Sequence, residues 1–178
     1  SGDDVLHVLQ GDADWVRRET ATGQVLDKRR LVDQRLWQAK IQGESAWWIA
    51  TQTGHQTLLA NETQTLWSGL LPDQAPDEQI SEFSISRHAP LAAALSERGH
   101  LWLLDGRQAQ LLPAAKTIPA GFDEVYLSPA GHRLVLMSSV RPCEILDLES
   151  FQVVARLNHP LGQHTFAAWS GDERRLLT

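Results

Sequence analysis

The segment that decides the fold is 127–136, which reads LSPAGHRLVL. Proline and glycine lie between a short apolar stretch and a longer one, so the segment predicts two strands joined by a tight turn. Two further apolar stretches follow, each bounded by turn residues. We therefore predict four consecutive strands, at Val125–Leu127, Arg133–Met137, Glu144–Leu148 and Gln152–Leu157.

The same unit recurs along the chain. The serine of this turn, Ser128, has counterparts 42 positions away on either side, at Ser86 and Ser170. A glutamine recurs at the start of the last strand of each unit, directly after a turn, at Gln24, Gln64, Gln108 and Gln152. A period of this size with four short strands is typical of β-propeller blades, whereas helical repeats need apolar residues at a spacing of about 3.6.

We therefore predict an all-β chain of β-propeller blades, forming one region over 1–178. The pattern indicates three whole four-stranded blades, at approximately 36–67, 83–112 and 125–157, and partial blades at 5–31 and 166–178. Residues 71–78 are the one linker-like segment, and their prolines and acids predict an exposed loop between blades. No domain boundary is expected there, because the repeat continues across it in register.

Two arrangements of these blades stay open. In one, the strand near 166–170 completes the first partial blade and closes a four-bladed ring. In the other, which we favour because residues 174–178 would be surplus in such a ring, the chain is a fragment of a larger propeller. Open strand edges would then permit self-association. Because the chain begins with Ser1 and not methionine, we expect it to be excised from a longer polypeptide.

Composition limits the partners. The formal net charge is −6, and phosphate backbones attract basic stripes, so a nucleic-acid partner is not expected. The most basic run, Lys28–Arg30, is interpreted as a solvated strand end. The single cysteine, Cys143, excludes an internal disulfide. No apolar run approaches the roughly 20 residues of a membrane-spanning helix.

The unit around 127–157 resembles those of the WD-repeat family and related bacterial propellers. The shared features are the Ser-Pro-x-Gly turn, the apolar strand after it and Asp147 at the end of the third strand, and a similar turn restarts at Ser170. The Trp-Asp pair of that family is replaced by Leu104-Asp105 and Leu146-Asp147. Gly54-His55 and Gly99-His100 precede the third strand, whereas the family's Gly-His pair precedes the first. We therefore do not transfer the family's histidine–aspartate network, and we expect these histidines at strand starts.

A second resemblance is to the extracytoplasmic propeller-like insert of bacterial phosphate ABC transporter permeases. It rests on a composition that is rich in tryptophan, glutamine and arginine and has only three lysines, Lys28, Lys40 and Lys116. It implies a periplasmic accessory or sensory domain tethered to a membrane protein. On this basis a periplasmic location is favoured over a cytoplasmic one.

Candidate chemical groups all have simpler structural interpretations. His159 and His164 flank a short loop, but no other metal ligand sits at a suggestive spacing. Cys143 begins a strand and is expected to be a small buried residue, not a nucleophile. Trp47 and Trp48 are expected to fill the two faces of one blade. Acid pairs are interpreted as solvated turn residues: Asp3-Asp4, Asp77-Glu78, Asp123-Glu124 and Asp172-Glu173.

The sequence therefore predicts no catalytic, cofactor-binding or metal-binding residue. The leading hypothesis is a non-enzymatic propeller module that binds a protein partner or the remainder of its own polypeptide. The alternative is the transporter domain described above. A third hypothesis is a hydrolase or lyase whose catalytic residues lie in blades outside this chain.

Overall fold

The computed structural model describes residues 5–10, 14–30, 36–42, 47–52, 56–60, 65–105, 110–111, 116–157 and 167–178. Within these ranges every regular element is a β-strand, and none is a helix. Consequently no helix of the described part is long and apolar enough to cross a membrane.

The described strands form five antiparallel sheets, and neighbours in each sheet follow chain order apart from one short strand of the third sheet. Blade I contains β1 (Val5–Gln10), β2 (Asp14–Glu19) and β3 (Val25–Arg30). Blade II contains β4 (Leu36–Gln42), β5 (Trp47–Gln52), β6 (Gln56–Ala60) and β7 (Thr65–Gly69). Blade III contains β8 (Ile80–Ile85), β9 (Leu91–Ser96), β10 (His100–Asp105), β11 (Gln110–Leu111) and β12 (Lys116–Thr117).

Blade IV contains β13 (Glu124–Leu127), β14 (Arg133–Met137), β15 (Cys143–Asp147) and β16 (Val153–Leu157). Blade V contains β17 (Ala168–Trp169) and β18 (Leu176–Leu177). In blade III, β11 and β12 both pair with β10, so two short strands share its outer edge. The predicted all-β propeller architecture is thus confirmed, with third strand β15 beginning one residue before the predicted Glu144.

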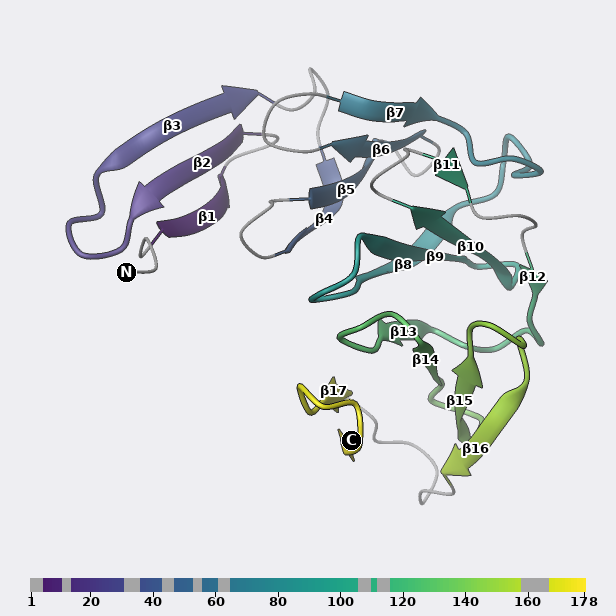
Figure 1. The fold of residues 1–178 in the computed structure, drawn as a ribbon. Helices are drawn as coiled ribbons and strands as arrows, with labels where there is room; N and C mark the ends of the chain where they lie inside the picture. Colours follow the sequence, from purple (N-terminus) through teal and green to yellow (C-terminus); the bar gives the residue numbers. More distant parts are fainter. Residues whose placement is uncertain are drawn as a thin grey trace.

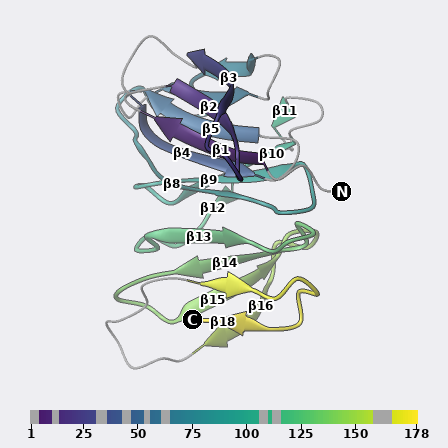
Figure 2. The same ribbon diagram turned by 90° about the vertical axis from the view of Figure 1, so that its left-hand side faces the viewer.

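The blades are arranged along an arc (Figure 1). The first strands of successive blades lie on the inside of the arc, and β3, β7 and β16 lie on the outside. In the view of Figure 2, blade III lies directly above blade IV. Among the described strands, β1 pairs with β2 alone and β17 with β18 alone. The structure therefore does not have the four-bladed closure, in which the strand near 166–170 would pair with the first blade.

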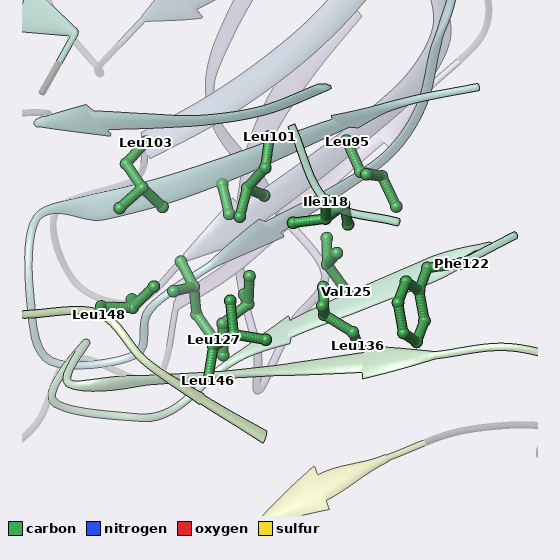
Figure 3. Packing of buried hydrophobic residues seen from close by; sticks show 12 residues of the cluster. Leu95, Leu101, Leu103, Ile118, Phe122, Val125, Leu127, Leu136, Leu146 and Leu148 are labelled. Atoms are coloured by element: carbon green, nitrogen blue, oxygen red, sulfur yellow. The ribbon is translucent and has the colours of Figure 1, made fainter. Parts of the chain in front are cut away.

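Blades III and IV meet through a shared apolar core (Figure 3). Strands β9 and β10 contribute the blade III side, and β13, β14 and β15 contribute most of the other. The buried members are Ala93, Leu95, Leu101, Leu103, Ile118, Phe122, Val125, Leu127, Leu134, Leu136, Leu146 and Leu148.

Alternation along the central strands explains their uninterrupted apolar sequences. Leu101 and Leu103 of β10 enter the core shared with blade IV, whereas Trp102 and Leu104 enter a core on the opposite face. Successive strand residues point to opposite faces. Because both faces of the blade are covered, both sets of positions must be apolar. β14 alternates in the same way, with Val135 and Met137 facing away from blade III.

The 42-residue serine period has a local structural cause. The backbone N–H of each serine donates to the carbonyl five residues later: Ser86 to Leu91 at 2.8 Å, Ser128 to Arg133 at 2.9 Å, and Ser170 to Arg175 at 2.9 Å. These bonds close the turn between the first and second strands of blades III, IV and V. In two of them the hydroxyl oxygen also accepts from the same residue five positions on, 2.9 Å from the nitrogen of Arg133 or Arg175.

The loop at 71–78 differs from the exposed linker that the sequence predicts. Leu71, Gln74 and Glu78 are buried, while Pro72 and Asp73 are exposed. The indole N–H of Trp102 donates to the carbonyl of Pro72 at 2.8 Å. The loop is therefore packed onto blade III, because the Pro72 carbonyl and the Glu78 carboxylate find hydrogen-bond partners on β10.

Candidate interaction surfaces

The connections between strands lie at two opposite ends of each blade, because every blade is an antiparallel meander. Turns between first and second strands lie at one end, here named the hairpin face: residues 86–91, 128–133 and 170–175. The other end, the loop face, carries the turns between second and third strands and the loops that enter the next blade. Its described parts are residues 70–79, 97–99, 118–123 and 138–142.

On the loop face of blade III, a buried carboxylate organises the loop that leads into β8. Glu78 has no solvent exposure. Its carboxylate accepts from the backbone N–H of Ala75 at 3.2 Å and lies 2.6 Å from His100 Nδ1. The side-chain amide of Gln74 donates to the Glu78 carbonyl at 2.8 Å and accepts from the N–H of Leu71 at 2.9 Å. Loop and blade are thus held together by polar contacts in a buried setting.

The pKa of Glu78 shows which effect dominates at this carboxylate. Burial by itself raises the pKa, because it disfavours the charged form. Hydrogen bonds from Ser96, the backbone of Ala75 and His100, together with the charge of His100, outweigh burial and lower the pKa below its ordinary value. The carboxylate is therefore ionised at neutral pH and acts as an anchor for the start of β10.

The solvated interpretation of the acid pairs is correct for some members and wrong for others. Asp77 is largely exposed and forms a 2.6 Å ion pair with Arg98, and Asp123 is also exposed. Glu78 contradicts the prediction because it is fully buried. Glu173 contradicts it as well, since its side chain is only 15% exposed and bonds to a neighbouring blade.

On the loop face of blade IV, Val140 is exposed on a turn that hydrogen bonds attach to a neighbouring loop. Val140 is 69% exposed, and its N–H donates to Ser138 Oγ at 3.1 Å. The residue that follows Val140 is Arg141, and its guanidinium donates to the carbonyl of Ala120 at 2.8 Å. The same guanidinium carbon lies 4.8 Å from the centre of the Phe122 ring.

Hydrogen bonds also hold the other side of this turn. The N–H and hydroxyl of Ser139 both donate to one carboxylate oxygen of Asp123, at 3.1 and 3.2 Å. The turn 138–142 is therefore attached to the loop 118–123 on both sides of Val140. We name Val140 with these two segments the Val140 platform.

On the hairpin face, the turns of blades III, IV and V form a connected row. The carbonyl of Pro129 accepts from the N–H of His88 at 2.7 Å and from the hydroxyl of Ser86 at 2.6 Å. One turn further, the Glu173 carboxylate accepts from the backbone N–H of Ala130 and lies 3.2 Å from His132 Nδ1. The row is thus linked by hydrogen bonds across both junctions between these blades.

The hydrogen bonds to Glu173 also affect its charge. Partial burial raises the pKa of Glu173, but hydrogen bonds from Ala130, Ser128 and His132 have the larger combined effect. The pKa is accordingly lowered, and the carboxylate remains ionised at neutral pH. The row itself contains six exposed basic residues: Arg87, His88, His132, Arg133, Arg174 and Arg175.

Cys143 has the buried position that the sequence predicts. It is fully buried and unpaired by disulfide. Burial, with a smaller effect of neighbouring Glu144, raises the pKa of its thiol to about 11. Because the thiolate is the reactive form, this environment is unsuited to a nucleophile.

The remaining sequence candidates are only partly described. His100 opens β10, as predicted, and its hydrogen-bond partner is Glu78. Trp47 and Trp48 begin β5, but their side chains lie outside the described set. Outside the described residues lie His55, Asp3, Asp4, His159 and His164. Within the described ranges, no three histidine, cysteine or acidic side chains are grouped as metal ligands would be.

Sequence reasoning missed the functions of Glu78, Glu173 and Val140 in these surfaces. A signal was present for Glu173, which lies 42 residues after Gly131 at the same position of the repeated turn. Both adopt positive φ, 57° and 78° respectively. A glutamate at a glycine position indicates that its side chain has a local task. Nothing comparable in the sequence distinguishes Glu78 or Val140.

Comparisons with known proteins identify the fold. No protein-family model matches the sequence, and no curated protein matches it. Among solved structures, the β-propeller domain of Cps50 (Swd1) from Myceliophteria thermophila is similar, with a TM-score of 0.60 and 14% sequence identity. The match covers 81% of this chain and 48% of that chain, so this chain spans about half the length of its structural neighbour.

None of these findings supports the resemblance to phosphate transporter permeases. At such low sequence identity, structural similarity identifies a fold and not an activity, since one fold serves many functions. Taken with the five antiparallel sheets, the comparison shows that this chain has the β-propeller fold.

Proposed function

We propose that this chain is a non-enzymatic β-propeller module that binds another protein, or another part of its own polypeptide, through the Val140 platform. The observation that carries the proposal is the 69% exposure of Val140 on a turn attached at both sides. An apolar side chain that is already held in place loses little conformational entropy on binding. Its burial in a partner would contribute about 1.5–3 kcal/mol if complete.

The surroundings of Val140 suit a protein interface. Arg141 and Phe122 lie beside it as a cation–π pair, and Asp123 and Ser139 supply polar groups at its margin. Interfaces commonly combine an apolar centre with a polar rim and are enriched in arginine. The high pKa and burial of the Cys143 thiol favour a binding function over nucleophilic catalysis.

The test compares two exposed valines in the full-length protein. Val140→Asp places a charge at the centre of the platform, whereas Val154→Asp changes β16, where Val154 is 54% exposed on the outer strand. Quantitative affinity purification of the wild-type protein first defines its partners. We expect Val140→Asp to lose a partner that Val154→Asp retains, while thermal melting shows both variants folded.

Two results would contradict this function. Retention of every partner by Val140→Asp would show that the platform is not the binding surface. Equal loss with both variants would indicate that binding responds to charge or folding and not to this turn.

We also infer that the blades belong to a larger propeller. Support comes from the unpaired edges of β1 and β18 within the described sheets and from a structural neighbour about twice as long. Unpaired edges invite strand addition, either from the rest of the polypeptide or by self-association. The transporter alternative stays a prediction, and membrane-spanning segments on both sides in the full polypeptide would favour it.

A further inference from the structure

We propose that the row of hairpin turns in blades III, IV and V is a second binding surface, which takes an acidic segment of a protein. The three turns, 86–91, 128–133 and 170–175, contain four arginines and two histidines against two acids. With neutral histidines their formal charge is +2, whereas the whole chain carries −6. The row is therefore opposite in sign to the whole chain. The acids at the same end of blades III and IV, Asp105, Asp147 and Glu149, lie outside the row, at the ends of the third strands or in the turn that follows.

Both acidic side chains of the row already accept hydrogen bonds from residues of the turns themselves. Asp172 accepts from the hydroxyl of Ser170 at 2.6 Å and from the N–H of Arg174 at 3.2 Å. The Glu173 carboxylate interacts with Ala130 and His132 in the preceding blade. Backbone N–H groups, the Ser170 hydroxyl and His132 therefore satisfy these two carboxylates, and the four arginines of the row are exposed to solvent.

The contacts between turns make the row one continuous surface. Pro129 receives two hydrogen bonds from blade III, and Ala130 donates one to blade V. The turn of blade IV is also close to that of blade III, since a Cβ built on Gly131 would lie 3.1 Å from Leu91 and 3.2 Å from Ala89. Arg87 and Arg174 are thus presented by turns of fixed relative position, while Arg133 of the turn between them lies opposite Asp147 of β15.

The chemistry of the row favours carboxylates. Guanidinium groups bind carboxylates with two parallel hydrogen bonds, and spaced arginines suit a segment with several acidic side chains. An extended peptide that crosses the turns can meet one arginine per blade. A nucleic acid is disfavoured because the rest of the chain is acidic and would repel a long phosphate backbone.

This surface lies at the opposite end of the blades from the Val140 platform and does not depend on it. The experiment measures binding of a labelled poly-glutamate peptide to the full-length protein by fluorescence anisotropy, at several salt concentrations. The test variant is Arg87→Glu with Arg174→Glu, which reverses charge on two turns of the row. The control, Lys28→Glu with Arg98→Glu, produces the same change of net charge on exposed ion-paired residues elsewhere.

We expect the wild-type protein and the control to bind poly-glutamate with an affinity that falls as salt rises. The test variant should bind about tenfold more weakly or worse, because repulsion replaces attraction at two positions. Val140→Asp should bind the peptide like the wild type, so the proposals for the two surfaces are tested independently. Circular dichroism melting checks that all variants are folded.

Three outcomes would overturn the proposal. Equal binding by the test and control variants would show that the row is not the site. Binding of poly-lysine as tight as that of poly-glutamate would remove the charge argument. Tighter binding of a single-stranded DNA oligonucleotide, lost in the test variant, would make nucleic acid the partner instead of an acidic protein segment.

Discussion

At the scale of single residues, two buried or half-buried glutamates connect parts of the chain that the sequence separates. Glu78 reaches His100, and Glu173 reaches Ala130 and His132 in the preceding blade. In both cases hydrogen bonds outweigh burial and lower the pKa of the carboxyl. A charged group in such a setting stabilises the fold only while its partners remain in place.

Glu78 leads to a pH-dependent prediction. A carboxyl whose pKa is lower in the folded than in the unfolded state stabilises the fold above its ordinary pKa of 4.5 and loses this effect as pH falls through the folded value. We expect Glu78→Gln to lower the free energy of unfolding by about 1–3 kcal/mol at pH 7. The difference from wild type should shrink as the pH is taken well below 4.5.

Urea denaturation at several pH values measures this difference. The control is Glu149→Gln, because Glu149 is exposed in the turn between β15 and β16. It should change stability little at any pH. A Glu78→Gln penalty that stays constant into the acid range would show that the carboxylate charge is not what stabilises the loop.

At the scale of the element, the turn between first and second strands is the unit that both repeats and joins the blades. Its serine N–H closes each turn, and its proline carbonyl in blade IV accepts from blade III. Gly131 combines a positive φ of 78° with close approach to the preceding blade. Only glycine meets both demands without strain.

A pair of glycine substitutions separates these two demands. Gly23 has a φ of 72° like that of Gly131, but open space where a Cβ would lie. Gly23→Ala should therefore cost only the backbone strain, about 1–2 kcal/mol. Gly131→Ala should cost roughly 1–3 kcal/mol more, because its methyl group would crowd the side chains of Leu91 and Ala89 in blade III.

Equilibrium unfolding of the two variants in the full-length protein checks this difference. Equal destabilisation would mean that the turn of blade IV can move away from blade III without loss. That result would also weaken the continuous surface proposed for the hairpin face.

Strands were predictable from sequence because their signals are local and repeated. β14 has the predicted bounds of Arg133–Met137, and its apolar run follows from burial on both faces. The role of Glu78 was not predictable, because its hydrogen-bond partner His100 lies 22 residues away, at the start of β10. An acid beside prolines has the local pattern of an exposed loop. Glu78 is buried and hydrogen-bonded because the loop packs against β10, which the local sequence does not reveal.

At the scale of the whole molecule, the open arc of blades is the feature on which both proposed surfaces depend. Blades III and IV share a continuous apolar core, and blade V packs on the far face of blade IV. The packing fixes the turns and loops at both ends relative to one another. The edges of β1 and β18 are unpaired within the described sheets, so the same packing can continue in further blades.

The most direct test of this account is an experimental structure of the full-length protein, by crystallography or electron cryomicroscopy. We predict that β17 still pairs with β18, and that β1 and β18 each gain a further strand in a propeller of more blades. A closed four-bladed ring, in which β17 leaves β18 to pair with β1, would contradict the account.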